Sequence, residues 1–178
     1  MKHKRNLLIG IALSATAGFL ALQSVNAPTA ETVTPDASED CYFVWAQQDD
    51  MELSEKLDAA VRALDERANA NAMLFGEDCV YADGTSTFGV METDFYVRRE
   101  VDDLADDDAF GDWIRQVMTV ILELPPEEIQ GPQPGFVEFR FIKLPTEQVI
   151  VRVPIEQYKS EAQGKTGAEL FRTFYEPP

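Results

Sequence analysis

Hydrophobic residues recur along the first part of the chain in two periods, one typical of strands and one typical of helices. Residues 41–46 form a short aromatic and β-branched run, which predicts a strand. An amphipathic helix of about four to five turns follows, with Asp49 or Asp50 as its N-cap. The inward positions of this helix are predicted to be Leu53, Leu57, Ala60, Val61, Leu64 and Ala68.

The pattern then changes to alternation, which predicts a β-hairpin. Residues 73–82 and 85–101 flank Asp83-Gly84, a pair that suits the two central positions of a tight hairpin turn. In the second arm, apolar positions alternate with charged and polar ones, so one face is expected on a core and the other in water. The residues on these two faces are Met91, Phe95 and Val97, against Glu92, Asp94, Tyr96 and Arg98.

A second helix and two further strands are expected in the remaining sequence. The helix begins in Asp106-Asp107-Asp108 and ends before Pro125-Pro126. Its inner stripe is predicted to be Phe110, Ile114, Val117, Ile121 and Leu124. A turn-rich loop at residues 131–135 leads to strands at 136–144 and 148–153, and short helices broken by Gly164 and Gly167 are expected in residues 154–174.

This order of elements predicts an α+β fold, a two-layer sandwich with two helices on one face of a mostly antiparallel five-stranded sheet. The first six elements match the plan of ferredoxin-like domains. That plan separates the first two strands, whereas a disulfide between Cys41 and Cys79 would require their Cα atoms to lie within about 7 Å. Either Cys79 lies near a strand end, or the first strand lies beside the second.

The N-terminal residues predict export. A basic start is followed by an apolar run over residues 7–22, and Val25-Asn26-Ala27 offers small residues for cleavage. Pro28 would stand just after the cut, where proline impedes cleavage, so an uncleaved signal anchor is the alternative. Residues 28–40 are rich in Pro, Thr and acids and are expected to be a disordered linker. The predicted organisation is therefore a signal at 1–27, a linker at 28–40 and one globular domain at 41–178.

The charge of the chain limits its partners. Fifteen Lys and Arg residues stand against 32 Asp and Glu residues, a formal net charge of −17. A surface so acidic is unsuited to nucleic acid or to anionic lipid, which both attract basic proteins. Contact with a membrane is therefore expected only through an uncleaved N-terminal segment.

The scarcity of histidine excludes most familiar enzymes. The single histidine, His3, lies in the expected signal, so the domain lacks the residue required by Ser-His-Asp triads, Cys-His pairs and imidazole metal sites. Because an exported chain with two cysteines most simply forms one bridge, we expect a Cys41–Cys79 disulfide rather than a catalytic thiol. No cofactor motif is found, since Gly164-Lys165-Thr166 lacks the first glycine of a phosphate-binding loop. Paired carboxylates are the remaining catalytic option.

The densest acidic segment lies at the start of the second helix and is a candidate metal site. Asp106 and Asp108 match the first and third ligands of an EF-hand loop, but Phe110 stands at the fifth position, where an oxygen ligand is required. The functional hypothesis for this segment is an irregular calcium site formed by Asp106, Asp108 and Asp112. We expect instead a capped and solvated helix end, without a dedicated metal.

Two features are candidates for a protein-binding surface. Trp113 lies to one side of the inner stripe of the second helix, where it either packs under the C-terminal helices or stays exposed. Pro132 and Pro134 lie in a loop that is either a plain connector or a recognition surface. We therefore expect an exported, non-catalytic binding or structural module of the bacterial cell envelope, with another envelope protein as its partner. The alternative is a carboxylate-dependent, glycosidase-like hydrolase acting outside the cytoplasm.

Overall fold

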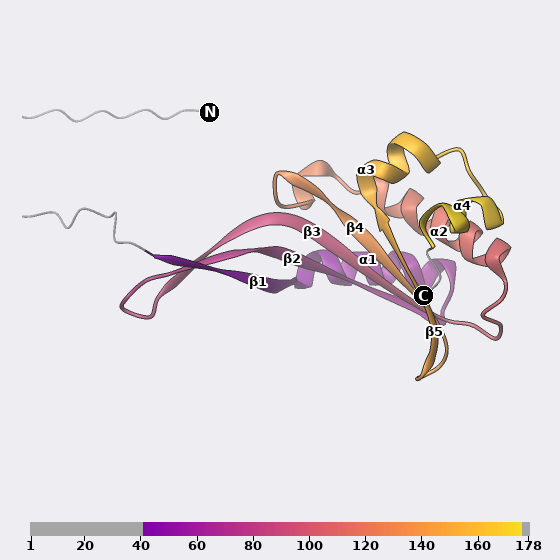
Figure 1. Ribbon diagram of the computed structural model, residues 1–178, viewed down its shortest axis with the longest axis horizontal. Coiled ribbons are helices and arrows are strands. Elements are labelled where there is room, and N and C mark those ends of the chain that lie inside the picture. The colour runs from indigo at the N-terminus through magenta and orange to yellow at the C-terminus, as the bar shows by residue number, and fades with distance from the viewer. Residues whose placement is uncertain (1–40, 176–178) are drawn as a thin grey trace, which may run out of the picture. The chain divides into compact units, whose positions relative to one another are not determined.

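The computed structural model describes residues 41–175, which form a two-layer α+β domain (Figure 1). The expected signal and linker at residues 1–40 lie outside the described residues. The strands are β1 (Tyr42–Asp50), β2 (Ala68–Val80), β3 (Ser86–Glu100), β4 (Gln133–Leu144) and β5 (Glu147–Pro154). The helices are α1 (Met51–Leu64), α2 (Asp107–Leu122), α3 (Ile155–Gln157) and α4 (Gly167–Phe174), with a 3-10 turn η1 (Pro126–Glu128) and a π-helical turn η2 (Tyr158–Ala162). The α+β sandwich predicted from the sequence is confirmed.

The five strands follow one another across the sheet in the order β1-β2-β3-β4-β5. Only β3 and β4 are parallel, and α2 forms the crossover between them. The ferredoxin-like plan is therefore wrong, because it would separate β1 from β2. The first strand lies beside the second, as the alternative drawn from the two cysteines predicts. β1 pairs antiparallel with β2, and the Cα atoms of Cys41 and Cys79 lie 5.3 Å apart.

Helix α1 continues directly from β1 and packs on the first half of β2. The Asp50 carboxylate caps it by accepting from the backbone N–H of Leu53 at 3.1 Å. The buried residues of α1 are Leu53, Leu57 and Val61, and they face the helix-side residues of β2, namely Ala68, Ala70 and Ala72. The helix ends at Leu64, four residues earlier than the sequence predicts, because Ala68 belongs to β2 and not to the helix. The small side chains of this part of β2 let the helix approach closely.

Helix α2 covers the rest of the same face of the sheet. The Asp106 side chain accepts from the N–H of Ala109 at 3.0 Å, which confirms the predicted N-cap. Phe110 stacks on Phe141 of β4, with ring centroids 4.0 Å apart, and Phe171 of α4 closes over it at 5.5 Å. The inner stripe predicted for this helix is buried as far as Ile121. Within residues 41–175, none of the helices has the length and apolar character to span a lipid bilayer.

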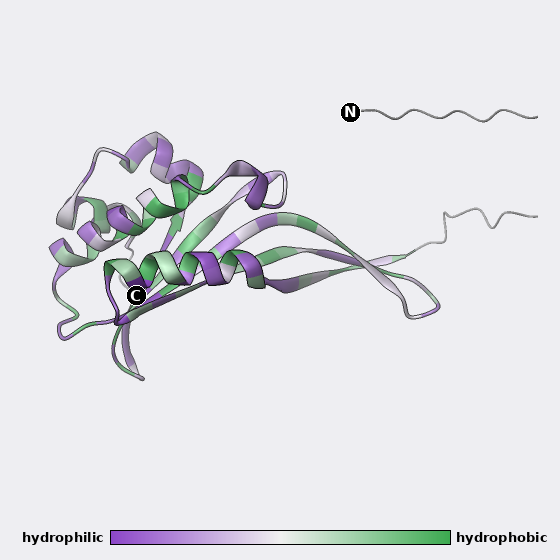
Figure 2. Cartoon of the chain, turned by 180° about the vertical axis from the view of Figure 1, so that it is seen from behind, coloured by the Kyte–Doolittle hydropathy of each residue, from purple (hydrophilic) through white to green (hydrophobic). Residues whose placement is uncertain are grey.

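The first three strands extend beyond the helices as an arm (Figures 1 and 2). We define the arm as residues 41–50 and 73–92, which comprise β1 and the parts of β2 and β3 that pair farthest from the core. A register shift at Phe75/Gly76 marks a β-bulge at its base, a feature that increases local twist. The tip is the predicted hairpin turn, where Gly84 takes a φ of +85° and its N–H donates to the Tyr81 carbonyl.

The segment before β4 is more regular than the loop predicted at residues 131–135, because β4 already begins at Gln133. Gly131 takes a φ of +95°, and a side chain there would meet the backbone of Met91 on β3. The preceding residue is fixed by the buried Thr93 hydroxyl, which donates to the Gln130 carbonyl at 2.8 Å. The prolines of this segment therefore belong to a strand entry held against β3.

Candidate functional site

Strand β1 places a run of large hydrophobic side chains in solvent. Tyr42, Phe43 and Trp45 are 63%, 65% and 65% exposed, and Val44 is 41% exposed. Eight large hydrophobic residues are exposed within residues 41–175, and these consecutive four are half of them. Single exposed hydrophobic residues are ordinary on proteins, but a contiguous group is typical of a contact surface. The sequence pattern of residues 41–46 predicts a strand but not this exposed surface.

The exposed residues of β1 are divided between the two faces of the arm. Register places Tyr42 and Val44 on the face that continues the helix side of the sheet, and Phe43 and Trp45 on the opposite, outer face. On the outer face Trp45 stacks on Phe75 of β2, with ring centroids 5.3 Å apart and ring planes inclined by 15°. Among the described residues, no helix lies over the part of the arm that carries Tyr42 to Trp45, and these side chains are exposed on both faces (Figure 2).

A disulfide fastens the free end of β1. Cys41 is bonded to Cys79 of β2, and no cysteine of the described residues is free. The predicted bridge is confirmed. It joins the residue immediately before β1 to the strand beside it, so the exposed strand is held to the arm covalently as well as by the ladder hydrogen bonds. A structural disulfide fits an extracytoplasmic protein, because disulfides persist in oxidising compartments.

The arm carries negative charge without positive charge. It contains no Lys or Arg. Its acids are Asp49, Asp50, Glu77, Asp78, Asp83 and Glu92. The exposed aromatic residues are therefore surrounded by a field of one sign, which attracts cationic partners and repels anionic ones.

Two buried carboxylates lie on the outer face of the sheet, near the base of the arm. Asp94 of β3 is 2% exposed and accepts one backbone hydrogen bond, from the N–H of Phe136 at 3.3 Å. Glu138 of β4 is 5% exposed, and its carboxylate forms ion pairs with Arg140 at 2.7 Å and Arg152 at 2.9 Å. Asp94 therefore lacks the direct arginine contacts that Glu138 has.

These two environments move the pKa values of the carboxylates in opposite directions. Burial raises the pKa of Asp94 to about 6, outweighing the hydrogen bond from Phe136, and the nearby charges of Glu92 and Glu138 add to the rise. Burial acts to raise the pKa of Glu138 as well, but the hydrogen bonds and charges of the two arginines outweigh it and lower that pKa below its ordinary value. One protonated acid beside one carboxylate is the arrangement that a glycosidase requires.

Neighbouring side chains cover this pair on the outer face, so that 2% of Asp94 and 5% of Glu138 are exposed. The Arg152 guanidinium lies 4.1 Å from the centre of the Phe136 ring, and Tyr96 meets the same ring edge-on at 5.9 Å. A side chain at residue 135 would meet the backbone carbonyl of Thr93 first and the Asp94 carboxylate next, which is why glycine is required there. The five cavities characterised among the described residues are all lined by other side chains. The sequence had placed Asp94 on the water-facing side of its strand, and nothing in its pattern signalled the burial.

The acidic segment at the start of α2 is occupied by contacts within the protein. Asp108 accepts from the N–H of Ala168 at 2.8 Å, and Asp112 accepts from the N–H of Gly167 at 3.3 Å, so both satisfy the first N–H groups of α4. Asp107 pairs with Arg172 at 2.7 Å, and Asp106 caps α2 itself. In residues 41–175, no group of three or more His, Cys, Asp or Glu side chains is arranged to hold a metal ion. Asp107, Asp108 and Asp112 therefore hold α4 against α2, and Asp106 caps α2.

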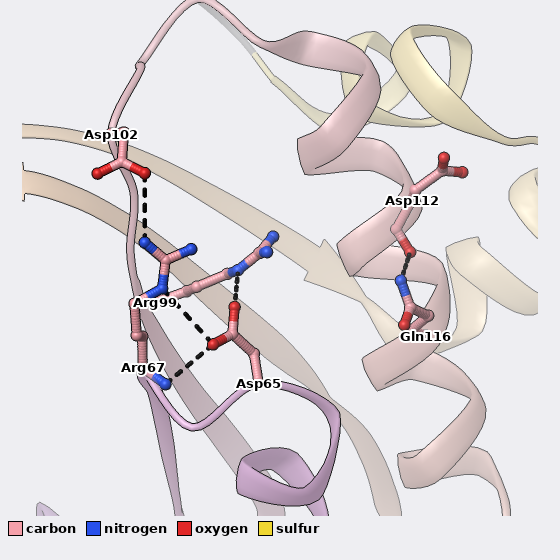
Figure 3. A network of polar contacts seen from close by, with 6 residues as sticks. All are labelled: Asp65, Arg67, Arg99, Asp102, Asp112 and Gln116. Carbon is pink, nitrogen blue, oxygen red and sulfur yellow. Dashed lines mark hydrogen bonds and ion pairs between the residues drawn. The ribbon is translucent and has the colours of Figure 1, made fainter.

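Trp113, a candidate from the sequence for a binding surface, lies in the core instead. It is 3% exposed, and the Arg99 guanidinium stacks 4.5 Å from its ring centre. Figure 3 shows Arg99 held in place by the Asp65 carboxylate at 2.9 Å, beside Arg67, whose guanidinium reaches Asp102 at 3.3 Å. Because its surface is covered in this way, Trp113 cannot contact a partner.

Pro132 and Pro134, the other sequence candidates, are exposed and line an apolar cavity of about 300 Å³. Its walls include Leu124, Ile129 and Ile155, with Lys159 at the edge. A cavity of about 370 Å³ on the other side of η1 has a mixed lining that includes Asp50, Glu52, Lys56 and Glu128. Lys56 forms an ion pair with Glu128 there, and the remaining acids leave this second cavity negatively charged.

Comparison with known proteins identifies no relative. No family model matches the chain, and no curated protein or solved structure is significantly similar to it.

Proposed function

We propose that this protein is an exported, non-catalytic binding module of the bacterial cell envelope, and that the arm is the element with which it contacts another envelope protein. The observation that carries the proposal is the run of exposed residues from Tyr42 to Trp45 on a strand fastened by a disulfide. A soluble domain gains nothing by exposing such a run to water, whereas binding energy at interfaces is concentrated in aromatic anchors.

The disulfide and the N-terminal sequence support a location outside the cytoplasm. The bridge fits a protein outside the cytoplasm. The apolar N-terminal run, followed by a Pro- and acid-rich linker, is the pattern of a domain secreted into the envelope or tethered to the outer side of the cytoplasmic membrane.

A carboxylate-dependent hydrolase is the second candidate, and one specific observation favours it. The pKa of Asp94 is raised and that of Glu138 is lowered, as an acid and its partner carboxylate require. Both carboxylates are almost fully buried, however, and Glu138 is already paired with Arg140 and Arg152. If purified protein hydrolyses a glycan at any measurable rate, we therefore expect the Asp94→Asn variant to show the same rate. A loss of that rate in the variant would support the hydrolase.

Site-specific photo-cross-linking in the producing cells tests the proposed function. A photoreactive phenylalanine analogue replaces Trp45, and the same analogue at Ile150 of β5, which is 43% exposed, is the matched control. We expect one discrete protein adduct from position 45, lost when Phe43→Thr is added, and none from position 150. Equal adducts from both positions, or none from position 45, would refute the arm as the binding element.

A further inference from the structure

We infer that the partner of the arm is a positively charged, extended segment of another protein that pairs with the free edge of β1 as a sixth strand. This inference rests on the proposed function and adds to it a mode of binding and a chemical class of partner. Strand addition satisfies backbone groups along a sheet edge, and side-chain contacts on the two faces supply the specificity.

The first observation is that β1 is an unprotected edge. Within the described part of the chain, β1 is the terminal strand, and β2 occupies only one of its two sides. Residues 41–48 contain no charged residue and no proline, and the charged residues of β1, Asp49 and Asp50, lie at its end beside α1. Sheet edges normally carry such residues because they prevent an unwanted strand from adding.

The opposite edge of the same sheet provides the comparison. Strand β5 carries Glu147, Arg152 and Pro154, the kinds of residue that block strand addition. It also exposes a single large hydrophobic side chain, Ile150, where β1 exposes four in succession. One edge of the sheet is therefore closed to pairing and the other is open.

The second observation is the alternation of hydrophobic side chains along this open edge. A strand added beside β1 would place its own alternate side chains next to Phe43 and Trp45 on the outer face, and next to Tyr42 and Val44 on the other. The stacked pair Trp45 and Phe75 already forms a flat apolar surface on the outer face. An incoming strand with hydrophobic residues on both faces can be accommodated along this length.

The third observation is charge, which decides between possible occupants. The arm has six acids and no Lys or Arg, so lysines or arginines in the added segment would be attracted to it. A second copy of this chain would instead bring the same acids together, because an isologous interface places identical surfaces in contact. The preceding linker of the chain, residues 28–40, is also acidic and contains no base.

The test uses the full-length protein and a synthetic nine-residue peptide in which lysines alternate with valine and tyrosine, followed by fluorescence anisotropy. Three comparison peptides are measured beside it: one with glutamate for lysine, one with serine for valine and tyrosine, and one N-methylated at four consecutive central amides. The N-methylated peptide keeps its side chains and charge but cannot donate the hydrogen bonds of a strand.

We expect the lysine peptide to bind, and each comparison peptide to bind at least about tenfold more weakly. The double variant Phe43→Thr/Trp45→Thr should reduce the affinity for the lysine peptide at least about tenfold, while Ile150→Thr on the closed edge should leave it unchanged. Raising the salt concentration should weaken binding, because the attraction of lysines to the arm is screened.

Specific results would overturn the inference. Equal affinity for the N-methylated peptide, or no binding of the lysine peptide, would exclude strand addition as the mode of binding. If position 45 still cross-links to another protein in that case, the proposed function is retained and only this inference fails. Sedimentation showing a dimer that Phe43→Thr/Trp45→Thr abolishes would assign the edge to a second copy. Binding of the lysine peptide only after residues 1–40 are deleted would assign it to the N-terminal segment of the chain itself.

Discussion

Trp45 of β1 stacks on Phe75 of β2 across the outer face of the arm, at a distance of 5.3 Å between ring centres. The contact joins an edge strand to its neighbour where no helix covers the sheet. Although 65% of Trp45 remains exposed, its ring is held in one orientation by this neighbour. A fixed, exposed aromatic side chain loses little conformational freedom when a partner binds to it, which favours binding.

Replacing Trp45 should therefore affect binding far more than stability. For Trp45→Thr we expect the free energy of unfolding, measured by urea denaturation, to fall by about 0.5–1.5 kcal/mol, which is the usual contribution of an aromatic pair. Leu57→Ala, in the core, is the control and should cost about 2–5 kcal/mol. A loss for Trp45→Thr as large as that of the core variant would show that this residue is part of the folded framework.

The Cys41–Cys79 bridge should stabilise the arm rather than create the fold. It closes a loop with a sequence separation of 38 residues, which corresponds to about 3–4 kcal/mol on the chain-entropy model. We expect reduction to lower the melting temperature and to accelerate amide hydrogen exchange in residues 42–48, while the exchange of α2 is unchanged. Mass spectrometry of unreduced protein should detect no alkylatable thiol, and two alkylatable cysteines would contradict the assignment.

Asp94 should make stability fall as the pH rises. Its pKa is about 6 in the folded protein, against an ordinary value of 3.8, so the folded state holds this proton more tightly than the unfolded chain does. The stabilisation is complete below about pH 4 and is lost as the pH rises through 6. Relative to wild type, Asp94→Asn should therefore gain stability between pH 5 and pH 7.5, by at most about 3 kcal/mol.

Urea denaturation at several pH values measures this difference, and Asp49→Asn on the exposed part of β1 is the control. The control should follow the wild-type pH profile. An Asp94→Asn protein whose difference from wild type is constant over this range would contradict the raised pKa.

The acids of α2 should behave as helix caps and not as calcium ligands. Asp108→Ala removes the acceptor for the Ala168 N–H and should cost about 1 kcal/mol, with faster hydrogen exchange in α4. Asp108→Asn keeps an acceptor oxygen and should retain most of the stability. Thermal melting with equal concentrations of calcium and magnesium should give equal, small shifts.

A dedicated calcium site would give a different result. One millimolar calcium at a micromolar site would add about 4 kcal/mol of stability. A calcium-specific rise of many degrees, abolished by Asp106→Ala or Asp108→Ala, would overturn the interpretation of this segment as a set of caps.

Local patterns in the sequence predicted most of the elements but not their arrangement. The caps at Asp50 and Asp106 and the turn at Gly84 depend on neighbouring residues, so they could be predicted directly. The order of the strands depends on pairs far apart in the chain, and the two cysteines were the single clue to it. The start of β2 was missed because alternating Ala and Asn have weak preferences, and packing under α1 decided their conformation.

The candidate site was harder to predict because exposure is a tertiary property. The aromatic residues in 41–46 would suit a buried strand equally well, and only the protruding arm leaves them in solvent. Trp113 shows the same difficulty, since its position to the side of the helix stripe was compatible with both packing and exposure, and the structure buries it under Arg99. The burial of Asp94 depends on the backbone approach of β4 at Gly135, which no local pattern announces.

The most direct test of the arm as the binding element is amide hydrogen exchange of the full-length protein with and without the partner recovered by cross-linking at position 45. Our account predicts strong additional protection in residues 42–48 and little change in β5, because the partner covers the arm and not the closed edge. Unchanged exchange in residues 42–48, with protection instead around Pro132 and Pro134 or on the outer face at Glu138, would contradict it.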